Sequence, residues 1–364
     1  MTIEFQPEQW NRVKDSAEQW WSGKLDRPLI HVRLNGYDSG RPAPELPDYE
    51  YTSFYNDAFP DAVVDRWDYN LSCTRFLGDA FPTVRPNFGA CVVAAFLGAQ
   101  LINRPDTVWF QADQTANLAE LDWQVNFENP VFARVRDIVK AAEARWQGQV
   151  LIGLTDLSGI LDILSVFRPG EELLMDLYDD PELVKNHIWK LYQIWWQYFD
   201  TLSSFVAATN PGYAAWDGMY SSSPYYMLQC DFAYMISPDM FREYVVPELS
   251  ATAARLGNAF YHLDGPGQLV HLDALLEIES IKGIQWIPGA GQPDISHWPD
   301  VYRRIKNAGK LIQFFSSQYE KGFDILDIIS DQLGTAKGIA FMVEGSRHQE
   351  DDVLRLLDRH NVCS

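Results

Sequence analysis

The chain has 364 residues, of which 29 are lysine or arginine and 50 are aspartate or glutamate, giving a formal net charge of −21. This negative charge opposes phosphate backbones and anionic membrane surfaces, so nucleic acid and membrane are excluded as partners. Hydrophobic residues make up 47% of the sequence, and neither a signal-peptide pattern nor an apolar run of about 18 residues is present, which predicts a globular cytoplasmic protein with a small-molecule substrate.

Short apolar runs rich in β-branched and aromatic residues recur along the chain, each followed by a turn and then a helical pattern. The runs lie at 29–33, 150–155, 213–217, 258–263, 283–287, 311–315 and 338–343, with a weaker, proline-containing run at 81–85. The helical patterns lie at 129–146, 181–208, 239–256, 298–308 and 349–359. Such alternation is typical of repeated βα units, and eight units predict an α/β fold with one domain over 1–364, a (β/α)8 TIM barrel. Residues 1–80 would form an N-terminal helical extension and the first strand.

Two features of the first hundred residues are open to more than one interpretation. The loop at 35–56 is too rich in proline and glycine for regular structure, so it forms either a lid or an oligomer contact, as in a homodimer. Arg85 is suited to bind a substrate carboxylate or phosphate in a bidentate manner. A structural ion pair with one of the many acidic residues is the competing interpretation for Arg85.

Acidic residues and one histidine lie where apolar runs end. Asp156, Asp217 and Glu344 each precede a turn, and His262 and Asp264 share one face of a strand because alternate side chains point the same way. Catalytic residues of such barrels lie at the carboxyl ends of the strands, so these five side chains should face one cavity. Their crowded negative charge favours a bound cation.

An imidazole and a carboxylate two positions apart can ligate one divalent metal, so His262 and Asp264 are predicted metal ligands, with Glu344 as the third. The competing interpretations are a His262–Asp264 hydrogen bond that orders the loop, or metal-free acid–base chemistry. For Glu344 the competing interpretation is an ion pair with Arg347.

A loop that carries a thiol and a carboxylate runs into a predicted helix start, with Ser237 as the N-cap and Pro238 in the first turn. The loop is interpreted as a wall of the active site. The substrate-binding candidates, besides Arg85, are Trp216, Cys230 and Tyr234. The candidates for moving a proton are Asp156, Asp217 and Asp231. Burial in the core is the competing interpretation for the cysteine and the aromatic residues.

Three motifs carry a resemblance to a known family. They are GEELLMDLYDDPELV at 170–184, ISPDMFREYVVPEL at 236–249 and HLDGPG at 262–267. In this order they resemble the uroporphyrinogen decarboxylase superfamily, which includes the decarboxylases of haem synthesis and cobalamin-linked methyltransferases. The resemblance covers positions 150–360, and the first 80 residues match only loosely.

The resemblance implies that His262 stands where the methyltransferases carry a zinc-binding histidine, while Asp264 replaces their cysteine and Glu344 lies near their later cysteine. An oxygen ligand leaves a more Lewis-acidic metal, which suits hydroxyl or ether oxygens. The arginine pair of the true decarboxylases is missing at 22–28, so the chain is expected to belong to the methyltransferase-like branch. No cobalamin-binding motif is present, so a corrinoid would be carried by a separate partner protein.

The predicted function is a zinc-dependent, methyltransferase-like enzyme that acts on a small methylated substrate, with a thiol or a corrinoid protein as partner. Two alternatives stay open. One is a metal-free decarboxylase or hydrolase that holds a small carboxylated substrate with Arg85. The other is a non-catalytic barrel that binds a small ligand.

Overall fold

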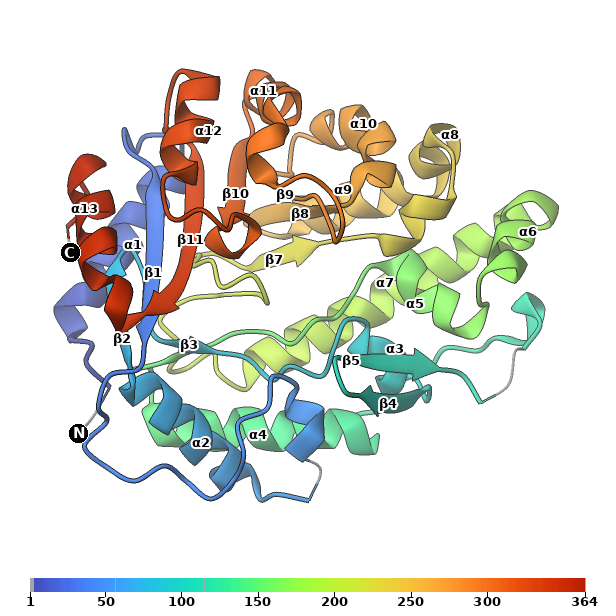
Figure 1. Ribbon diagram of the computed structural model, residues 1–364. Helices are drawn as coiled ribbons and strands as arrows, with labels where there is room; N and C mark the ends of the chain where they lie inside the picture. Colours follow the sequence, from blue (N-terminus) through green and yellow to red (C-terminus); the bar gives the residue numbers. More distant parts are fainter. Residues whose placement is uncertain (1–2, 56, 114–115, 364) are drawn as a thin grey trace.

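The computed structural model describes residues 3–55, 57–113 and 116–363, and its helices pack around a largely parallel sheet (Figure 1). The strands are β1 (Leu29–Asn35), β2 (Thr74–Gly78), β3 (Thr83–Val84), β4 (Gln100–Arg104), β5 (Thr107–Gln111), β6 (Leu151–Ile152), β7 (Tyr225–Leu228), β8 (Asn258–Asp264), β9 (Gly283–Ile287), β10 (Leu311–Phe315) and β11 (Ile339–Ser346). The helices are α1 (Pro7–Trp21), α2 (Pro60–Ser72), α3 (Val92–Phe96), α4 (Pro130–Trp146), α5 (Ile160–Phe167), α6 (Glu171–Asp179), α7 (Pro181–Ser204), α8 (Pro238–Met240), α9 (Val246–Arg255), α10 (Leu272–Leu276), α11 (Pro299–Asn307), α12 (Ile325–Leu333) and α13 (Glu350–Arg359). None of the helices in these described ranges is long and apolar enough to span a membrane.

Seven strands form one sheet in the order β2-β1-β11-β10-β9-β8-β7. Every neighbouring pair is parallel except β1 with β2, which pairs His31 with Gly78 in antiparallel register. β2 thereby occupies the edge of β1 that a closing barrel strand would need. β3 and β6 form a separate parallel pair. Since the sheet ends at β2 and β7, the fold is barrel-like α/β, and the closed TIM barrel is not confirmed.

The predicted strands of the second half agree best with the structure. The runs at 283–287 and 311–315 coincide with β9 and β10. The predicted strand at 213–217 is wrong, because Tyr213 forms only an isolated bridge with Ser221, and Gly218, at φ 76°, turns the chain immediately after Asp217. The chain joins the sheet at β7 instead, which the sequence pattern did not predict.

The helix start at Ser237 is confirmed, since its side chain accepts a hydrogen bond from the Met240 N–H at 3.2 Å and Pro238 opens α8. The continuous helix predicted at 239–256 is interrupted by a π-helical turn, Phe241–Val245, between α8 and α9. Pro247 explains the interruption, because it has no N–H to donate to the preceding turn.

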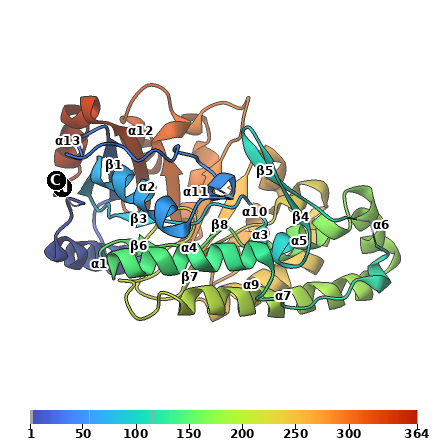
Figure 2. The ribbon, with the colours of Figure 1, turned by 90° about the horizontal axis from the view of Figure 1, so that it is seen from below.

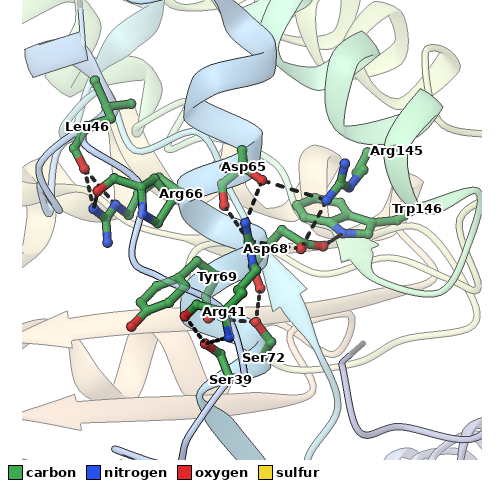
Figure 3. Close-up of polar contacts among 11 residues, drawn as sticks. Ser39, Arg41, Leu46, Asp65, Arg66, Asp68, Tyr69, Ser72, Arg145 and Trp146 are labelled. Atoms are coloured by element: carbon green, nitrogen blue, oxygen red, sulfur yellow. Dashed lines mark hydrogen bonds and ion pairs between the residues drawn. The ribbon is translucent and has the colours of Figure 1, made fainter. Parts of the chain in front are cut away.

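The proline-rich loop after β1 is tied to α2, which lies along α4 (Figure 2). The guanidinium of Arg41 donates to Asp65 at 3.0 Å and to Asp68 at 3.2 Å, and Arg66 donates to the Leu46 carbonyl at 2.8 Å (Figure 3). These contacts hold the loop as a wall beside the strand ends. Position 56, the last of the predicted loop, lies outside the described residues.

Candidate functional site

A chain of hydrogen bonds connects residues on β8, β9 and β10 with Asp217, which precedes β7, and with Tyr225 on β7. The His262 Nδ1 contacts the Gln285 Oε1, and the Gln285 Nε2 donates to the Gln313 Oε1 at 2.7 Å. The Gln313 Nε2 then donates to the Asp217 Oδ2 at 3.2 Å, and the Tyr225 hydroxyl donates to the same oxygen at 2.7 Å. Both glutamines are fully buried. We call these five residues the relay.

The relay fixes which nitrogen of His262 carries the proton. An ionised Asp217 only accepts hydrogen bonds, so Gln313 must present its NH2 group to it and its carbonyl to Gln285. Gln285 must then present its carbonyl to His262, whose Nδ1 therefore carries the hydrogen. The lone pair of Nε2 is left available for a ligand.

The charges of the relay agree with this assignment. Burial raises the pKa of Asp217 to about 6, so the carboxylate is ionised above that pH. Burial also lowers the pKa of His262, against the opposing effects of Gln285 and Asp264, so the imidazole is neutral at pH 7. A neutral imidazole with one free lone pair is the form that binds a metal or accepts a proton.

The free nitrogen of His262 faces Asp264, with 3.9 Å between Nε2 and Oδ2. Trp216 lies edge-on to the imidazole, with ring centroids 5.0 Å apart. Two ligands of one tetrahedral zinc ion lie about 3.4 Å apart, so a small shift of the half-exposed Asp264 would bring both onto one ion. Among the described residues, no three His, Cys, Asp or Glu side chains are grouped for a metal. The carboxylate of Glu344, the predicted third ligand, instead lies 3.8 Å from the guanidinium of Arg33. In the part of the chain that the structure describes, Glu344 forms its ion pair with Arg33 rather than with Arg347.

A cavity of about 580 Å³ is lined by residues that include Arg33, Arg85, Trp216 and Glu344. Trp216 connects it to His262, but His262 and Asp264, which were expected to face the same cavity as Glu344, are not among its lining residues. Neither guanidinium donates a hydrogen bond to another described residue, and the buried Arg33 Nε has no partner there. Burial lowers the pKa of both arginines, and nearby acids, including Asp217 for Arg85, oppose that shift. A smaller adjoining cavity shares Arg33, Trp216 and Glu344 and is also lined by Asp217.

Asp156, which was expected to face the same cavity, is 8% exposed and lines neither of these two cavities. Its Oδ1 accepts hydrogen bonds from the Ser158 N–H at 2.9 Å and the Tyr226 hydroxyl at 3.3 Å. Burial raises its pKa to about 6, and Ser158 and Arg85 oppose the rise. The hydrogen bond to Ser158 orders a turn in which Ser158 itself has φ 66°. Asp156 therefore has a structural contact as well as a place near Arg85.

The loop at 230–235 separates into a buried part and an exposed part. Cys230 is 1% exposed, and burial raises its pKa well above the usual value, so it packs as a core residue. Asp231 lines a second cavity of about 780 Å³. Tyr234 is 64% exposed and covers the turn at Gly267, where a Cβ atom would lie 2.1 Å from the tyrosine ring.

Sequence reasoning missed Arg33, Gln285 and Gln313. Each had a visible signal, because Arg33 ends the run LIHVR, and each glutamine sits in the middle of an otherwise apolar run, GIQWI or LIQFF. A polar residue at the centre of a buried strand needs a hydrogen-bond partner. Two such strands therefore indicate a polar contact between them.

No protein-family model matches the chain, and no curated protein matches it. Among solved structures, a methyltransferase from Methanosarcina mazei is similar to it, with a TM-score of 0.57, 14% sequence identity and coverage of 92% of each chain. At this identity the likeness supports a shared fold. The resemblance to the uroporphyrinogen decarboxylase superfamily is not confirmed by the family comparison.

Proposed function

We propose that the protein is an enzyme of the methyltransferase kind, in which His262 activates a small substrate at the carboxyl ends of the strands. The observation that carries the proposal is the relay, which makes Nδ1 the donor and leaves Nε2 free, while burial keeps the imidazole neutral. A histidine needed only to order a loop would not require two buried glutamines and a buried aspartate behind it. The structural neighbour described as a methyltransferase supports the reaction class.

We further propose that His262 and Asp264 hold a zinc ion through Nε2 and Oδ2. Zinc at this place would supply Lewis acidity toward an oxygen or sulfur atom of the substrate. The relay sets the direction of the Nε2 lone pair, Trp216 limits the space beside the imidazole, and Arg85 lies where it can hold an anionic part of the substrate. A thiol or a separate corrinoid protein would accept or donate the methyl group.

Replacing His262 with glutamine tests the zinc proposal, because the side chain keeps similar bulk and loses the imidazole. We expect His262→Gln to bind zinc at least about tenfold more weakly than the wild type, as is usual when a ligand or its support is lost. Asp264→Cys should bind zinc more tightly, since thiolate is the softer ligand. The measurement is zinc affinity by competition with a chromophoric chelator, with the exposed His348→Gln as the matched control.

Zinc binding by the wild type and by the control variant decides whether the zinc proposal holds. If wild-type protein supplied with excess zinc binds none, or if His262→Gln and His348→Gln bind zinc equally, the zinc proposal is wrong. The thermal unfolding midpoint of each variant, measured alongside, separates loss of a ligand from loss of the fold.

A second candidate function is supported by the two arginines. Arg33 and Arg85 line one cavity in a protein of net charge −21, yet neither guanidinium has a hydrogen-bonding carboxylate among the described residues. Arg33 has only a long 3.8 Å ion pair with Glu344, so both guanidinium groups keep N–H donors that suit a substrate carboxylate. We propose as the alternative a metal-free decarboxylase or hydrolase that acts on a small carboxylated substrate.

The alternative predicts binding of simple carboxylates. We expect glutarate to protect the wild type against thermal unfolding, and Arg33→Met and Arg85→Met each to weaken its binding about tenfold or more, as for loss of a charge-assisted hydrogen bond. Arg347→Met, which removes an exposed arginine, is the control. Equal glutarate affinity in all three variants would rule the carboxylate site out.

A further inference from the structure

The second cavity differs in character from the His262 site. Its volume of about 780 Å³ falls in the range of small-molecule sites, which is about 300–1,000 Å³. The β4–β5 hairpin supplies Trp109 and Phe110 to its walls, and Phe232 faces them from the loop after β7. Trp109 is 62% exposed, an unusual position for a tryptophan that packs only against its own protein. The walls are thus largely aromatic and apolar.

Two carboxylates line this largely apolar cavity, and neither forms an ion pair with a described residue. Asp162, on α5, is 7% exposed; its Oδ1 accepts the Phe232 N–H at 2.8 Å, while its buried Oδ2 has no partner among the described residues. Asp231 opens onto the same cavity and forms no ion pair within the described chain. For the buried Asp162, an unpaired carboxylate oxygen away from water is costly, so the group takes up a proton or pairs with a cation. Asp231 is exposed at the cavity and accessible to a ligand from solvent.

The pKa of Asp231 is consistent with a carboxylate that lacks a cationic partner. Burial, and then the charges of Asp162, Asp156 and Asp264, raise the pKa of Asp231 to about 8, although the residue is exposed. A bound cation would lower the cost of ionising it.

The lining favours an organic cation over a metal ion. No three metal-binding side chains are grouped in the described part of the chain, and aromatic walls suit the methyl or methylene groups that surround an ammonium nitrogen. Arg104 also lines the cavity, from the exposed hairpin. Its positive charge repels a cationic group, which is therefore expected at the two aspartates and away from Arg104.

We propose that the cavity between the β4–β5 hairpin and α5 binds a small organic ammonium compound, with its cationic group at Asp231 and Asp162 and its apolar part against Trp109 and Phe110. This site goes beyond the proposed function, since it lies in a different cavity and uses none of the zinc or carboxylate ligands. It gives the protein a binding site for a second substrate or for the cationic part of one substrate.

Binding of benzyltrimethylammonium to the full-length protein, measured by isothermal titration calorimetry, tests the site. We expect the wild type to bind it and Asp231→Asn to bind it about tenfold more weakly or worse, as for loss of a charged partner. Trp109→Ala should weaken binding about fivefold, in keeping with the loss of an aromatic contact to the apolar part of the ligand. Asp239→Asn, which removes an exposed carboxylate eight positions away, should bind as the wild type does.

Two further probes separate charge from shape. Benzyl alcohol, which has the ring without the charge, should bind at least about tenfold more weakly than the ammonium compound. Zinc and magnesium chloride should not compete with it. The proposal is overturned if benzyltrimethylammonium does not bind the folded wild type, if Asp231→Asn and Asp239→Asn bind it equally, or if the neutral ring binds as well. Competition by the metal ions would assign the aspartates to a metal instead.

Discussion

Asp217→Asn is expected to move the proton of His262 from Nδ1 to Nε2. Asparagine can donate a hydrogen bond where the ionised aspartate only accepts one. Once position 217 donates, Gln313 accepts with its carbonyl and presents its NH2 to Gln285, which in turn presents its NH2 to His262. The Nδ1 must then accept, so the relay reverses and Nε2 loses its free lone pair.

The tautomer of His262 is measured by the nitrogen chemical shifts and two-bond couplings of 15N-labelled histidine, at a pH of about 8 so that Asp217, with a pKa of about 6, is ionised in the wild type. Zinc affinity should fall about 10- to 100-fold in Asp217→Asn, the usual range when the group that orients a metal ligand is changed.

Tyr225→Phe is the matched control for this change. It removes the other hydrogen bond to the Asp217 Oδ2, at 2.7 Å, but leaves Asp217 a pure acceptor. The proton of His262 should therefore remain on Nδ1 in Tyr225→Phe. If His262 of Asp217→Asn still carries its proton on Nδ1, the asparagine at position 217 accepts from Gln313 through its carbonyl oxygen as the aspartate does, and the predicted reversal of the relay is wrong.

Much of the fold could be predicted from the sequence because the strands of the second half are short buried runs bounded by turns. β9 and β10 were predicted to the residue for this reason. The earlier half was harder, since β3 and β6 have only two residues each, and the β4–β5 hairpin, QLINR-x₂-TVWFQ, lacks the polar–apolar alternation that indicates a strand. The antiparallel β2, which leaves the sheet open, depends on pairing between distant segments that no local pattern reveals.

The candidate site could be predicted in part. The expectation that His262 and Asp264 end one strand agrees with β8, which ends at Asp264. Asp217 joins His262 through the relay, although the strand predicted to end at Asp217 is wrong. Local reasoning did not distinguish Cys230 from Asp231, because adjacent residues in a loop have no fixed alternation. The partner of Glu344 was also beyond local reasoning, since Arg33 is brought beside it by the β1–β11 pairing of two strands at opposite ends of the chain.

Glu248→Gln is expected to stabilise the protein at alkaline pH and to leave it nearly unchanged at pH 5. Glu248 lies buried on α9, and its carboxyl group is 3.5 Å from the Thr252 hydroxyl. Burial, followed by the charge of Asp162, raises its pKa to about 8 from an ordinary value of 4.5. The folded protein therefore holds this proton across a range of pH in which the unfolded chain has lost it.

The direction of the effect follows from that difference in bound protons. Between pH 4.5 and about 8 the folded state binds more protons than the unfolded state, so the free energy of unfolding decreases as pH rises and levels off above about 8. Each unit of pKa difference is worth about 1.4 kcal/mol, and relaxation of the site reduces the total, so the loss is on the order of 2–5 kcal/mol. Glutamine is neutral at every pH, so Glu248→Gln removes this loss of stability. Urea unfolding at pH 5 and pH 9 measures the effect, with the exposed Glu279→Gln as control. If Glu248→Gln shows the same pH dependence of stability as the wild type, the assignment of this proton to Glu248 is contradicted.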